Sequence, residues 1–190
     1  MCRLLFLLVL LTTSSYADES VSICFNYGCA TQSTVKFSSQ QLNSVAQILA
    51  AAHNAAEERT LLAQVIGVLY AWAGEQTPIH ADHGGNFADA GVQGAMDCID
   101  HSTTTTRFLR LLEQRDALHF HHVIAATRRG WIFQHFTATI EEMPLAAMNA
   151  TSVATTQRPR FAVDSWYVDN GKPAIVLPLA EWFNYGGPGA

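Results

Sequence analysis

Basic residues are few and dispersed in this chain of 190 residues. Lysine and arginine number 11 against 16 aspartates and glutamates, and the formal net charge is −5. No basic cluster is larger than Arg128-Arg129, so neither nucleic acid nor an anionic membrane surface is expected as the main partner. The sequence also has no internal repeat, no long low-complexity segment and no HExxH zinc-binding pattern.

An apolar run long enough to cross a bilayer is missing as well. The unbroken run Leu4–Leu11 is too short to span, so no stable membrane anchor is expected. It follows Met1-Cys2-Arg3 and precedes a small polar stretch that ends at Ala17, which is typical of an export signal; the alternative is a retained N-terminal helix. We expect residues 1–17 to be a signal peptide and 18–190 a single exported domain, periplasmic or extracellular.

Cysteine is scarce, with four residues in the chain. Cys2 lies in the expected signal peptide, and Cys24 and Cys29 are close enough in sequence to form a disulfide, as an oxidising compartment favours. The alternatives for this pair are two free thiols or half of a metal site, although no second pair completes a zinc site. Cys98 is left over, which indicates a reactive thiol or an intermolecular bond.

The first half of the expected domain reads as helical. Apolar spacing predicts a helix from Ser38 or Ser39 to about His53, and a second from Ala55 or Ala56 to Ala73. A glycine-rich loop, residues 74–96, then leads to a third helix that begins at Asp97, with Ser102 as the competing start.

The second half reads as antiparallel strands at 118–127, 131–141, 160–168 and 174–177, with a turn at 128–130 and a flexible tail at 186–190. A further short strand is predicted at Val35–Phe37. Helices followed by strands predict an α+β fold, in which N-terminal helices and a cysteine-bearing helix pack on an antiparallel sheet.

A cysteine, a histidine and an aspartate, in that order along the chain, could form a catalytic triad with a thiol nucleophile. Cys98 would stand at a helix start, where the partial positive charge lowers a thiol pKa. His135 lies in a strand and could take the thiol proton, and Asp164, in another strand, could fix the imidazole tautomer. Asp97 and Asp100 oppose this activation, because neighbouring carboxylates raise a thiol pKa.

The motifs around these residues resemble the bacterial transglutaminase-like cysteine proteinases of the papain-like superfamily. The resemblance rests on Asp97-Cys98-Ile99-Asp100, on the strand segment that starts at His135, and on the segment that ends in Asp164. It implies a papain-like core with Cys98 as nucleophile, His135 as base and Asp164 as orienting acid, with Asp169 in Val168-Asp169-Asn170 as a second candidate acid. It also implies a peptide or protein substrate and an amide bond as the target, and we expect no cofactor.

Histidine and aspartate residues in and near the glycine-rich loop form a second group of candidate site residues. We predict that the substrate cleft is lined from the set Asp82, His83, Asn86, Gln93, Asp97 and Asp100. His119 and His121 share a strand face and could bind a metal together with His83, a weaker alternative. The third alternative is a non-catalytic exported binding domain that keeps the papain-like frame.

Overall fold

The computed structural model describes residues 17–85, 87–144, 157–185 and 187. The expected signal peptide apart from Ala17, the cleft candidate Asn86 and the tail 186–190 apart from Gly187 lie outside the described residues.

Helices and antiparallel strands make up an α+β fold, as predicted. The elements in chain order are β1 (Glu19–Phe25), β2 (Thr31–Phe37), α1 (Ser39–Leu49), α2 (Ala55–Gly74), the 3-10 helix η1 (Pro78–Ala81), α3 (Cys98–Gln114), β3 (His121–Arg129), β4 (His135–Glu142), β5 (Arg160–Asp164), β6 (Ile175–Pro178) and α4 (Leu179–Trp182). In the part of the chain that the structure describes, no helix combines the length and apolar character needed to cross a membrane.

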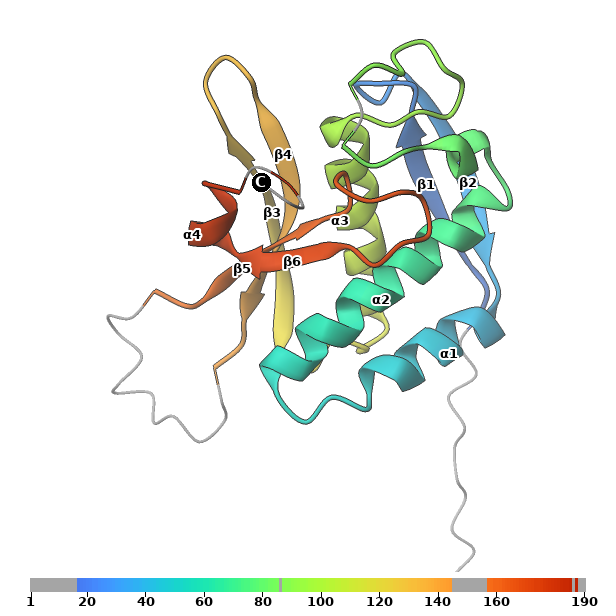
Figure 1. Ribbon diagram of the computed structural model, residues 1–190. Coiled ribbons are helices and arrows are strands. Elements are labelled where there is room, and N and C mark those ends of the chain that lie inside the picture. Colours follow the sequence, from blue (N-terminus) through green and yellow to red (C-terminus); the bar gives the residue numbers. More distant parts are fainter. Residues whose placement is uncertain (1–16, 86, 145–156, 186, 188–190) are drawn as a thin grey trace, which may run out of the picture.

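Two antiparallel sheets flank the central helix α3 (Figure 1). β1 and β2 form a hairpin, and β3, β4, β5 and β6 form the larger sheet in sequence order. The sequence prediction missed β1 and gave β2 only its last three residues. β1 buries Val21 and the run Ile23–Phe25, whereas β2 buries Val35 and Phe37 and half-buries Thr31 and Ser33 on the same face. The polar first half of β2 is a weak strand signal without the partner strand.

The predicted start of α3 at Asp97 is confirmed. The Asp97 side chain accepts hydrogen bonds from the backbone N–H groups of Ile99 and Asp100, and the Asp100 carboxylate accepts one from the Asp97 N–H. This reciprocal cap satisfies N–H groups that a helix start leaves unpaired. Cys98 is therefore the first residue of the helix.

The threonine run of α3 lies inside the protein, where its hydroxyls find partners. Thr104 is fully buried and accepts a hydrogen bond from the backbone N–H of Cys24 at 3.0 Å, while Thr106 bonds the Ser102 carbonyl oxygen at 2.6 Å. Further along, Phe108 and Leu109 are buried in the main apolar core. The helix thus packs by polar contacts in its first half and apolar contacts in its second.

The turn between β3 and β4 differs from the sequence prediction. β3 continues to Arg129, and residues 130–134 form the turn in place of 128–130. Gly130 has φ 77°, and a Cβ there would collide with the Phe133 carbonyl oxygen, so the tight turn requires glycine. Alternating aromatic residues imitated a strand at 131–134, but none of the described strands pairs with them. β5 likewise ends at Asp164 and not at Val168.

Candidate active site

His135 and Asp164 meet at one edge of the larger sheet. β4 begins at His135 and β5 ends at Asp164, and these strands are antiparallel neighbours with Ala138 opposite Val163. The imidazole Nε2 lies 2.7 Å from the Asp164 Oδ2, and both side chains are largely buried. Because an ionised carboxylate only accepts hydrogen bonds, this contact places the proton on Nε2 and a lone pair on Nδ1.

Aromatic residues hold this pair in place. The indole N–H of Trp182 donates to Asp164 Oδ2 at 2.7 Å, and the backbone N–H of Trp166 donates to Oδ1 at 3.1 Å. The Trp182 ring stacks on the His135 imidazole with centroids 5.6 Å apart, and Trp166 and Tyr167 contact the same imidazole at 4.9 and 5.3 Å. The orientation of the imidazole is therefore fixed on several sides.

The Cys98 sulfur lies against the backbone on both sides of His135. The thiol is half-buried, and its Sγ is 3.8 Å from the carbonyl oxygen of Gln134. The backbone N–H of Phe136 also interacts with the sulfur. The structure thus brings the start of α3, the start of β4 and the end of β5 to one place.

The electrostatic surroundings of Cys98 agree with the predicted opposition by Asp97, and burial and Asp164 add to it. Burial raises the pKa of the thiol, and the charges of Asp97 and Asp164 raise it further. The N–H groups of Phe136 and of Cys98 itself act in the opposite direction, but the pKa stays above its ordinary value. The helix start alone does not produce a thiolate, so the resting thiol is protonated at neutral pH and needs a proton acceptor.

Asp97 and Asp100 are directed at the loop between β1 and β2. Gly28 N–H donates to Asp97, while Tyr27 N–H and Cys29 N–H donate to Asp100 at 2.8 and 2.6 Å. Asp100 is fully buried, and burial together with the charge of Asp97 raises its pKa to about 6. These two predicted cleft residues anchor the disulfide loop and do not belong to the lining of the cavity beside His135.

The disulfide between Cys24 and Cys29 is formed. Asn26, Tyr27, Gly28 and Cys29 have positive φ values, which turns their backbone toward the start of α3. The sulfurs and an Asp100 oxygen lie within 4.8 Å of one another, a grouping that could hold a metal ion only if the disulfide were reduced.

A buried hydrogen-bonded chain lies beneath the site, one helical turn after Cys98. His101 Nε2 is 2.9 Å from Asp82 Oδ2, and its Nδ1 is 2.8 Å from the Ser165 hydroxyl. Asp82 also accepts the backbone N–H of Met96 at 2.7 Å. The chain therefore ties the glycine-rich loop and the residue after Asp164 to α3. Asp82, predicted for the cleft, is buried in this network.

The remaining predicted site residues are separated from one another. His83 is exposed and pairs with Asp169 at 3.5 Å, and Gln93 is exposed. His121 Nδ1 lies 2.8 Å from the buried Glu58, whereas His119 is exposed. The structure does not bring the three histidines of the metal hypothesis together within one site.

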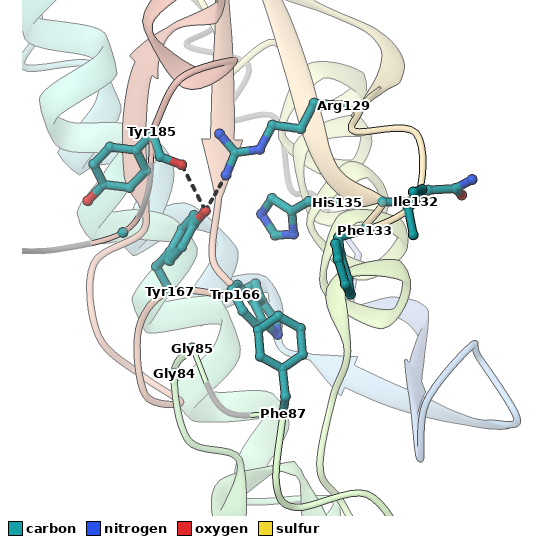
Figure 2. A pocket seen from close by; sticks show the side chains of 12 residues that line it. Gly84, Gly85, Phe87, Arg129, Ile132, Phe133, His135, Trp166, Tyr167 and Tyr185 are labelled. Atoms are coloured by element: carbon teal, nitrogen blue, oxygen red, sulfur yellow. Dashed lines mark hydrogen bonds between the residues drawn. The ribbon is translucent and has the colours of Figure 1, made fainter. Parts of the chain in front are cut away.

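An open cavity of about 820 Å³ adjoins His135. Its lining includes Phe87, Ile132, Phe133, Trp166, Tyr167 and Tyr185 (Figure 2). Arg129 crosses one side, where its guanidinium donates to the Tyr167 hydroxyl and the Trp182 carbonyl oxygen and lies 4.5 Å from the Trp182 ring centroid. Sequence reasoning missed Arg129 and Trp182, because neither stands in a local motif.

Comparison with family models, with curated proteins and with solved structures finds no match for the chain.

Proposed function

We propose that the protein is an exported thiol-dependent hydrolase or acyl transferase that acts on an amide bond of a peptide, an isopeptide or a cell-wall peptide. The observation that carries the proposal is the buried 2.7 Å contact of His135 Nε2 with Asp164, beside the two peptide groups that border the Cys98 sulfur. A histidine held in this tautomer has Nδ1 available as a base. The disulfide supports export, since such bonds persist in oxidising compartments.

The proposed reaction begins with a protonated thiol, in agreement with the raised pKa of Cys98. His135 Nδ1 takes the thiol proton as Sγ forms a bond to the substrate carbonyl carbon. The backbone N–H of Cys98 stands outside the Asp97 cap and can bond the resulting oxyanion. When the C–N bond breaks, the imidazolium gives its proton to the departing amine, leaving a thioester.

The second half of the reaction releases the acyl group. A water molecule, or an amine in a transfer reaction, gives a proton to His135 and attacks the thioester carbonyl. The C–S bond then breaks, and the proton returns from the imidazolium to the Cys98 sulfur. Asp164 stays ionised throughout and stabilises the imidazolium at each step.

The test is cleavage of a defined mixture of synthetic peptides, followed by mass spectrometry. New termini, or adducts with an added amine such as glycine methyl ester, are expected with the wild-type protein and are expected to be absent with Cys98→Ser and His135→Ala. Products that persist in both variants would contradict the proposal.

A second candidate function is a non-catalytic exported binding domain that retains a papain-like frame. The raised pKa of the Cys98 thiol favours this candidate, because an inert structural cysteine has that property. Peptide binding without any cleavage or transfer, together with ordinary thiol reactivity, would support it. Membership of the transglutaminase-like family stays a prediction under either function.

A further inference from the structure

The turn between β3 and β4 exposes three consecutive large apolar side chains. Trp131, Ile132 and Phe133 are 88%, 81% and 92% exposed. Single exposed apolar residues are common on protein surfaces, but a contiguous group of this size marks a binding surface. Ile132 and Phe133 line the cavity beside His135, whereas Trp131 does not.

A second part of the cavity lining, around Phe87, is also apolar and is held in place. Phe87 is 77% exposed, and its ring contacts Trp166 with centroids 4.7 Å apart. The backbone N–H groups of Gly84 and Gly85 bond Asp169 and the Trp166 carbonyl oxygen at 3.0 and 2.8 Å. These two bonds fix the glycine-rich loop to the segment that follows β5 (Figure 2). This part of the cavity lining is therefore in place before a ligand binds.

The charges at the cavity favour an uncharged apolar occupant. No carboxylate belongs to its lining among the described residues, and its guanidinium, Arg129, is already bonded to Tyr167 and Trp182. A basic side chain would meet the Arg129 charge with no acid to pair with. An acidic side chain would have to lose its hydration among aromatic rings, beside a guanidinium that already donates to Tyr167 and Trp182.

We propose that this cavity is the specificity pocket of the enzyme and that it takes an apolar or aromatic side chain of a peptide, next to the bond that Cys98 attacks. The inference rests on the proposed function for the position of that bond. The cavity, about 820 Å³, falls within the size range of pockets that bury most of a drug-sized ligand. Ile132 and Phe133 form the wall against which the apolar side chain packs.

Binding of blocked, fluorescein-labelled peptides to the Cys98→Ala protein tests the pocket without catalysis. The peptides share Gly-Ser flanks and differ at one central position, which is Phe, Leu, Lys or Glu. We expect the Phe and Leu peptides to bind at least about tenfold more tightly than the Lys and Glu peptides. Phe133→Ser is expected to remove this preference, whereas Trp131→Ser, the equally exposed neighbour outside the pocket, changes affinity less than about twofold.

Three results would overturn the proposal: equal affinity for all four peptides, no binding of any of them, or equal losses in the two serine variants. Binding to phosphatidylglycerol vesicles that Trp131→Ser abolishes, with no peptide preference, would assign the exposed turn to a lipid surface instead.

Alkylation of Cys98 by iodoacetamide in the wild-type protein distinguishes failure of the pocket proposal from failure of the proposed function. The reagent reacts with the thiol and needs no specificity pocket. A rate that depends on His135 together with lost peptide selectivity would overturn the pocket alone. Retained selectivity with a rate independent of His135 would overturn the proposed chemistry.

Discussion

Replacement of Asp164 by Asn tests whether the buried carboxylate sets the chemistry of His135. The two side chains have the same shape, but Asn has one acceptor oxygen where Asp164 uses two to receive His135, Trp182 and the Trp166 N–H. At least one buried donor loses its partner, which is expected to lower the free energy of unfolding by about 1–3 kcal/mol.

The same change removes the negative charge 2.7 Å from His135 Nε2. This charge stabilises the imidazolium that forms when the thiol proton moves to His135. Alkylation of Cys98 at neutral pH should slow at least about tenfold in Asp164→Asn, because the weaker proton acceptor outweighs the lower thiol pKa that loss of the Asp164 charge brings. Asp169→Asn is the matched control, since Asp169 is exposed, pairs with His83 and accepts the Gly84 N–H.

Urea unfolding gives the stability change, and ¹⁵N NMR of the imidazole reports the tautomer directly. We expect the proton on Nε2 in the wild type and a shift toward Nδ1 in Asp164→Asn, where the amide can donate to Nε2. The reasoning would be refuted by an Nδ1–H tautomer in the wild type, or by Asp169→Asn slowing alkylation as much as Asp164→Asn.

Three further predictions concern the support of the site. Glu58→Ala leaves the His119 and Phe120 N–H groups and the buried His121 imidazole without their acceptor, so urea unfolding should show a loss of about 3–5 kcal/mol. The raised pKa of Asp100 gives a contribution to stability that is complete below its ordinary pKa and is lost as pH rises to about 6. In that window wild-type stability should fall by up to about 1.4 kcal/mol per pH unit more than that of Asp100→Asn. The double change Cys24→Ala/Cys29→Ala opens a short covalent loop and should lower the melting midpoint, at a cost of roughly 2 kcal/mol.

The sequence was sufficient to predict the elements that local signals, such as caps and apolar spacing, define. The Asp97-to-Asp100 cap predicted the start of α3, and the apolar spacing of α1 and α2 predicted both helices, with α1 ending four residues early at Leu49. The chain order of the third helix and the strands placed Cys98, His135 and Asp164 on elements that do meet.

Local sequence patterns could not predict the contacts between residues that are far apart in the chain. Trp182 reaches Asp164 from a four-residue helix near the end of the chain. Tyr27 N–H meets Asp100 across 73 positions, so Asp100, predicted for the substrate cleft, instead anchors the loop between β1 and β2. Phe133 seemed to belong to a strand because alternation alone does not reveal whether a pairing strand is present.

The rate of Cys98 alkylation as a function of pH, in the wild type and in His135→Ala, tests the central claim most directly. If His135 takes the thiol proton, the wild type should react at neutral pH at least about tenfold faster than His135→Ala, whose profile should follow an isolated thiol of raised pKa. Superimposable profiles for the two proteins would contradict the account.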